Sequence, residues 1–138
     1  MSAWRTAPGG LAAVGWRYLA LLVLGLWLAP ALLGLAAHQI IRLLGPEHLG
    51  ENYRQAEFIA LLTLYSPLVT WGGFGLILAG AVFLLRRGAF GWASAVLLGA
   101  SAGLSLSLHT GEPTPVLIGI FLTALIRVLL ALKAPDVF

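Results

Sequence analysis

The residues able to do acid–base or metal chemistry gather in two segments that connect apolar stretches of the chain. Imidazole and carboxylate groups together can bind a divalent metal or pass protons. His48 and Glu51 are three positions apart, so a helix would place them on one face. These residues also suit plain solvation at helix ends, and because no compact motif such as HExxH occurs, we predict no metal site. The two segments hold His38, His48, His109, Glu47, Glu51, Glu57 and Glu112.

Arg127 is the charged residue that lies inside an apolar stretch. A charge at the centre of a membrane helix costs about 2.5 to 3.5 kcal/mol on insertion scales. Two interpretations follow: Arg127 contacts an anion, a lipid head group or a quinone, or its long side chain extends to the phosphate layer, which we favour. No catalytic residue is predicted, and an enzyme is the less favoured class. The candidates for a ligand site or a proton path are His38, His48, Glu51, His109 and Arg127.

Four apolar runs must position these residues. Each run has about the length of 20 residues that a membrane-spanning helix needs. The mean hydropathy is +0.98 and only 9% of residues are charged, against about 25% in soluble domains. The sequence therefore predicts an all-α fold: one integral membrane domain, residues 1–138, forming a four-helix transmembrane bundle. The approximate spans are residues 18–37, 59–85, 90–108 and 115–132.

The basic residues indicate the orientation of this bundle, because lysine and arginine collect in cytoplasmic flanks. Only Arg42 and Arg54 would lie on the opposite side, so both termini are predicted to be cytoplasmic and the loops Gln39–Phe58 and Thr110–Thr114 to face outward. The apolar stretch Ile40–Leu44 either lies on the membrane surface or extends the first helix. We expect a multi-pass protein of the cell membrane, with no nucleic-acid partner. The cytoplasmic set is Arg5, Arg17, Arg86, Arg87, Arg127 and Lys133.

The third run carries small residues at every fourth position, a pattern that lets another helix approach closely. Packing within the chain is favoured over packing with a second copy. In the fourth run, Gly119, Thr123, Arg127 and Ala131 form a second candidate inward face. Pro30 and Pro67 are expected to kink or break their helices. The stripe consists of Gly91, Ala95, Gly99, Gly103 and Ser107.

Several functional classes lack their residues. A di-haem bundle needs paired histidines deep in the membrane, and a proton-coupled exporter is expected to carry an embedded carboxylate. Neither is present in the four runs. There is also no nucleophile, base and orienting group at recognisable spacing, and no phosphate-binding glycine loop. No cofactor is predicted.

Two stretches resemble the DoxX-like membrane proteins. Residues 36–45, AAHQIIRLLG, end a first helix near a histidine and a basic residue, and residues 73–80, GFGLILAG, form a glycine-punctuated second helix before the Arg86/Arg87 turn. This resemblance covers most of the chain. It implies four helices and an association with quinone-linked or other redox complexes, and it transfers no catalytic residue.

The leading hypothesis is that the protein is a small accessory or structural subunit of a membrane complex. The family resemblance suggests that this complex carries out redox or quinone chemistry. Its expected partners are membrane lipids and either protein subunits or a second copy of the chain. The alternative is a small transporter or channel. A membrane enzyme acting on a lipid-soluble substrate comes third. The transport path would be lined by Ser101, Ser105, His109 and Arg127.

Overall fold

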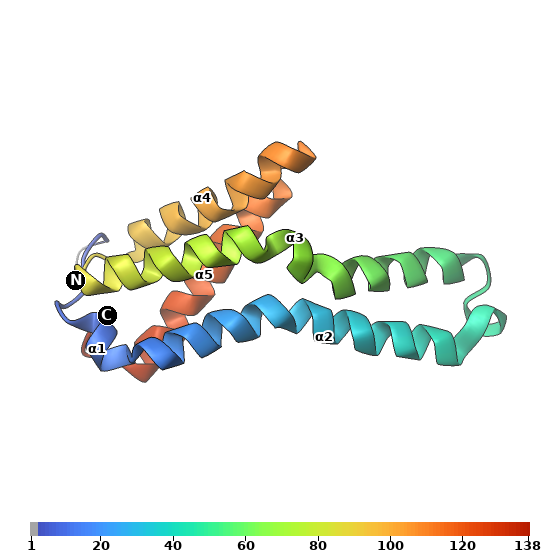
Figure 1. Cartoon of the computed structure of the whole chain (residues 1–138), viewed down its shortest axis with the longest axis horizontal. Helices are drawn as coiled ribbons and strands as arrows, with labels where there is room; N and C mark the ends of the chain where they lie inside the picture. Colours follow the sequence, from blue (N-terminus) through green and yellow to red (C-terminus); the bar gives the residue numbers. More distant parts are fainter. Residues whose placement is uncertain (1–2) are drawn as a thin grey trace. The chain divides into compact units, whose positions relative to one another are not determined.

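The computed structural model describes residues 3–138, and those residues form helices joined by short connections, with no strand among them (Figure 1). The all-α prediction is therefore confirmed. Three helical stretches are long and apolar enough to cross a membrane: Trp16–Arg86, Trp92–Thr110 and Thr114–Lys133. The elements are α1 (Gly10–Val14), α2 (Trp16–Leu49), the short 3-10 helix η1 (Gly50–Asn52), α3 (Tyr53–Arg86), α4 (Trp92–Thr110) and α5 (Thr114–Lys133).

The chain divides into two compact units. The first, here called the packed unit, combines Met1–Val23 with Gly72–Phe138. The second, here called the hairpin, is Leu24–Trp71. Helices α2 and α3 contribute to both units, because each helix crosses a boundary between them.

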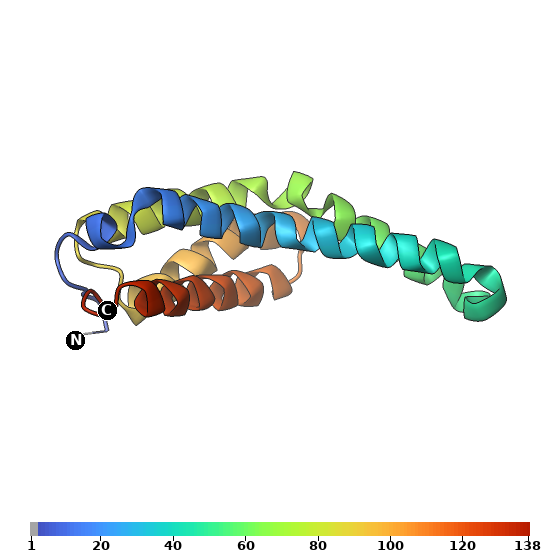
Figure 2. The ribbon, with the colours of Figure 1, turned by 90° about the horizontal axis from the view of Figure 1, so that it is seen from below.

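A true core exists in the packed unit, where α4 and α5 run antiparallel and pack against each other (Figure 2). The predicted inward face of α5 is confirmed for Gly119, Thr123 and Arg127, which are buried. Leucine and aromatic side chains from several helices fill the interior, which is how an apolar helix face is satisfied. The largest fully buried side chains are Phe90, Leu19, Leu85, Ile126, Leu130 and Thr123.

Backbone hydrogen bonds gather three distant segments at one end of the packed unit. The Thr6 amide donates to the Gly88 carbonyl in the turn between α3 and α4, and the Ala7 amide donates to the Val137 carbonyl, both at 2.8 Å. The Ala93 amide donates to the Ala3 carbonyl, also at 2.8 Å. The N-terminal segment, the α3–α4 turn and the C-terminal segment therefore form one layer over the ends of α4 and α5.

Most of the predicted outer loop Gln39–Phe58 is helical. Helix α2 continues to Leu49 and α3 begins at Tyr53. Of the two interpretations of Ile40–Leu44, helix extension is the one that the structure adopts. Gly45, at φ 66° and ψ 175°, is not helical, so α2 consists of two helical segments that meet at a kink before Pro46. Glycine tolerates this positive φ because it has no side chain.

Helices α2 and α3 continue through Pro30 and Pro67, so of the expected kink or break, the break does not occur. Proline lacks the amide that would bond the carbonyl four residues earlier. At Pro67 that carbonyl belongs to Thr63, and the Ser66 hydroxyl donates to it at 2.8 Å instead. From the neighbouring helix α2, Trp27 Nε1 donates a hydrogen bond to the Pro67 carbonyl at 3.1 Å. Side chains thus replace the missing bond and fasten α3 to α2.

Candidate functional site

Arg127 lies in the packed unit as a buried cation, with only 6% of its surface exposed. Its position follows from α5, whose inward face runs through Thr123 one turn earlier. The Thr123 hydroxyl donates to carbonyls of its own helix, Gly119 and Ile120, at 3.1 Å. Thr123 is therefore satisfied without Arg127, which leaves the guanidinium to find other partners.

Two aromatic rings are those partners. The guanidinium carbon of Arg127 lies 4.2 Å from the centre of the Trp92 ring and 5.3 Å from that of Phe138. Phe138 in turn packs edge-on against Phe90, with ring centres 6.3 Å apart. A desolvated cation–π contact contributes about 2 kcal/mol. Arg127 therefore joins α5 to the start of α4 and to the C-terminal segment.

The polar edge of Arg127 is left unsatisfied. Nε is fully buried and has no hydrogen-bond partner among the described residues. Thr6 Oγ1, in the N-terminal segment at the same end of the packed unit, is also buried without a partner. Buried polar groups normally have partners, so both atoms mark this end as a site with unused hydrogen-bonding capacity.

The sequence analysis identified Arg127 but missed the aromatic cover. Phe138 reaches Arg127 only because the C-terminal segment folds back on the N-terminal one. No local pattern encodes that contact. Trp92 is 46% exposed, and its ring also covers the guanidinium.

The histidine and glutamate candidates do not form a metal site. Within residues 3–138, no group of three or more histidine and acidic side chains is placed to hold a metal ion. The His48 ring contacts the Leu44 carbonyl and the His109 ring contacts the Ser105 carbonyl through Nδ1, each at 2.8 Å. His38 Nδ1 is buried without a partner, and Glu51 is exposed in η1.

The serines of the proposed transport path bond to their own helix. Ser101 donates to the Leu97 carbonyl and Ser105 to the Ala102 carbonyl, both at 2.8 Å. Both serines and His109 lie on exposed positions of α4, whereas Arg127 is buried beside Trp92 at the opposite end of that helix. The geometry does not gather these four residues along one path.

The small-residue stripe lies mainly on buried positions of α4. A side chain at Gly99 would collide with the Gly119 backbone and with Thr123, and one at Gly103 would collide with Pro115 and Val116. The other members fit the same layout: Ala95 is buried, Gly91 caps the start of α4 against Ala3 and Trp4, and Ser107 donates to the Glu112 carbonyl.

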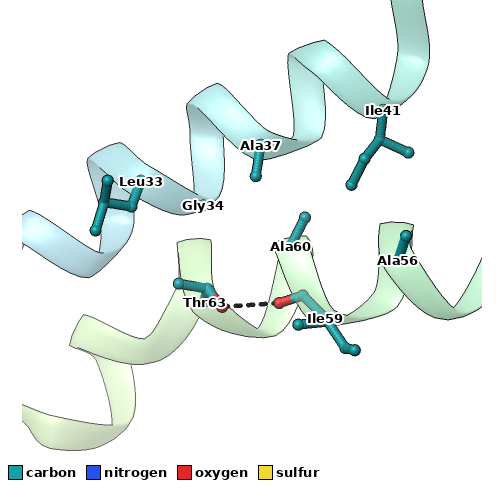
Figure 3. A pocket seen from close by; sticks show the side chains of 8 residues that line it. All are labelled: Leu33, Gly34, Ala37, Ile41, Ala56, Ile59, Ala60 and Thr63. Carbon is teal, nitrogen blue, oxygen red and sulfur yellow. Dashed lines mark hydrogen bonds between the residues drawn. The ribbon is translucent and has the colours of Figure 1, made fainter. Parts of the chain in front are cut away.

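The hairpin contains an open apolar groove of about 410 Å³ between α2 and α3 (Figure 3). Ala37 and Ile41 project from α2 toward the small residues of α3. The Thr63 hydroxyl donates to the Ile59 carbonyl at 2.8 Å, so its polar group is already satisfied. The sequence analysis missed this groove, although its small residues recur at helical spacing. The lining is Leu33, Gly34, Ala37, Ile41, Ala56, Ile59, Ala60 and Thr63.

Comparison with known proteins adds no relative. No protein-family model, no curated protein and no solved structure matches this chain.

Proposed function

We propose that the chain is a multi-pass protein of the cell membrane that serves as an accessory or structural subunit of a membrane complex. In this proposal α2, α3, α4 and α5 each cross the bilayer, and both termini face the cytoplasm. The positive-inside rule supports this orientation, since Arg5, Arg86, Arg87 and Lys133 flank the end that holds both termini.

The length of α2 and α3 is the observation that carries the proposal. Helix α3 has 34 residues, or about 51 Å at 1.5 Å per residue, and α2 runs from Trp16 to the kink at Gly45, whereas the hydrocarbon core is about 30 Å thick. Counted from Trp16, about 20 residues of α2 reach Leu35, and counted back from Arg86, about 20 residues of α3 reach Pro67. A tilt of about 20° adds only one or two residues.

The residues beyond that reach are nevertheless apolar and uncovered. Leu43 is 86% exposed, and Ile40, Phe58 and Ile59 are more than half exposed. Lipid tails do not cover side chains outside the hydrocarbon core. Exposure of a large apolar patch to water is energetically unfavourable. A protein partner seated on this part of the hairpin accounts for them. The likeness of AAHQIIRLLG and GFGLILAG to DoxX-like proteins supports a partner complex linked to redox or quinone chemistry.

The test is purification in a gentle detergent from native membranes, followed by mass spectrometry of every protein that co-purifies. The proposal predicts larger subunits in a fixed ratio to this chain. Leu43→Gln should weaken that association, while Arg42→Gln, an exposed neighbour that is already polar, should leave it unchanged. A chain that purifies alone or only with itself contradicts the proposal and directs attention to flux assays in vesicles.

A further inference from the structure

We infer that Arg127, in contact with the Trp92 and Phe138 rings, forms a binding site for a phosphate group, and that the phosphate belongs to an anionic phospholipid at the cytoplasmic surface. The inference rests on the membrane orientation proposed above and not on the accessory-subunit role. It rests on the packing of one buried guanidinium, on the charge around it and on its depth in α5.

The first step is the unused hydrogen-bonding capacity of the guanidinium. Its central carbon lies over the Trp92 ring, 4.2 Å from the ring centre. The contact with the ring is not a conventional hydrogen bond, so it leaves the N–H groups able to bind an acceptor. Nε has no hydrogen-bond partner. A phosphate accepts two parallel N–H bonds from a guanidinium, which matches the unused capacity of Arg127.

The second step is the charge of the packed unit. Its acidic residues are Glu112 and Asp136, against six basic ones. Glu112 lies in the connection between α4 and α5, at the far end of both helices from Arg127. Asp136 is nearer, in the C-terminal segment, but it is exposed whereas Arg127 is buried. A buried cation without a carboxylate partner is unfavourable unless an anion is supplied from outside. The basic residues of this unit are Arg5, Arg17, Arg86, Arg87, Arg127 and Lys133.

The third step is depth, which selects a lipid over a soluble anion. Arg127 lies six residues before Lys133, the last residue of α5, or about 9 Å along the helix. That distance places the guanidinium near the boundary of the hydrocarbon core, and its cover, Trp92, is 46% exposed. Tryptophan prefers this boundary. Lys133, stacked 5.7 Å from the Tyr18 ring, adds a second cation at the same end.

The experiment follows the Arg127 Nε–H signal by nitrogen-15 NMR while the full chain in detergent is titrated with dioleoylphosphatidylglycerol. Loss of the signal in Arg127→Lys assigns it. We expect a saturable downfield shift with this anionic lipid and none with dioleoylphosphatidylcholine at the same concentration. No shift with either lipid or with inorganic phosphate overturns the inference, and this result is independent of any variant that fails to fold.

Binding of the same lipid is then counted by native mass spectrometry. Arg127→Gln should weaken it about tenfold, the loss expected for one charge-assisted pair, while Arg86→Gln, which removes an equal charge from an exposed position, should change it far less. Equal losses in the two variants contradict a built site. A shift produced by inorganic phosphate but not by the lipid retains the phosphate chemistry of the site and contradicts the lipid as its source.

Discussion

The packed unit and the hairpin are both built from apolar helices, but they differ in the size of the side chains that they bury. In the packed unit, side chains as large as Phe90 and Leu19 are fully buried. In the hairpin the buried residues are Gly34, Ala60 and Pro67, all small. Two helices alone bring their small residues together but cannot enclose large ones, because each helix has one neighbour. The comparison teaches that the packed unit encloses large side chains in its own interior, whereas the hairpin encloses only small ones, although both expose large apolar side chains.

The largest effect is expected from filling the α4–α5 contact. Gly99→Leu would drive a side chain into the Gly119 backbone and Thr123, and we expect a loss of about 3 kcal/mol in the free energy of unfolding. Denaturant titration of helicity in detergent measures it. Gly75→Leu is the matched control, because nothing lies within 4 Å of a β-carbon there. Equal losses in the two variants would contradict the described packing.

The same change in the hairpin should act locally. Gly34→Leu would place a side chain against the Leu64 and Ala60 backbones, so we expect α2 and α3 to separate by about 2 Å and stability to fall by about 2 kcal/mol. The chain has no cysteine, so spin labels at Gln39→Cys and Gln55→Cys can report the separation. Gly25→Leu, with open space around it, should leave the distance unchanged, and a shift in both variants would count against the hairpin geometry.

A smaller effect is expected from the bond between Trp27 and the Pro67 carbonyl. Trp27→Phe keeps an aromatic ring but removes the 3.1 Å hydrogen bond, which should lower the free energy of unfolding by about 1 kcal/mol. Trp71→Phe, at a position 67% exposed, is the control and should change stability by less than about 0.5 kcal/mol. Similar values for both tryptophans would show that this bond contributes nothing.

The smallest loss of stability is expected when the hydrogen bond that compensates for the missing amide of Pro67 is removed. Ser66→Ala removes the donor to the Thr63 carbonyl and should lower stability by about 0.5 to 1 kcal/mol. In a Pro67→Ala background, the alanine amide supplies the missing donor, so the same serine change should have almost no effect. A double-mutant cycle on unfolding free energies measures this coupling. Additive losses would mean that the serine hydroxyl has another role.

The sequence predicts what depends on neighbouring residues and misses what depends on distant ones. The apolar runs and the spacing of Gly119, Thr123 and Arg127 correctly indicate helices and a buried face, since both follow from a 3.6-residue period. For the predicted outer loop Gln39–Phe58 the sequence left helix extension open, and the structure is helical there apart from a kink at Gly45 and the short η1 turn.

Long-range contacts account for the rest of the site. The cover over Arg127 joins residues 92, 127 and 138, and the C-terminal segment is held there by a backbone bond to Ala7. Backbone bonds between distant segments carry no side-chain signature, so no pattern in the sequence could reveal this one. The groove in the hairpin, by contrast, repeats small residues at helical spacing, a signal that sequence analysis can use.

The most direct test of the central claim, that the hairpin receives a protein partner, compares two phenylalanines of similar exposure. Phe58 in the hairpin is 61% exposed and Phe121 in α5 is 66% exposed. Each is replaced by the photo-crosslinker p-benzoylphenylalanine in native membranes, and the products are identified by mass spectrometry. We predict that position 58 crosslinks to one or a few defined proteins while position 121 crosslinks mainly to lipid. Crosslinks to lipid alone from both positions would contradict the account.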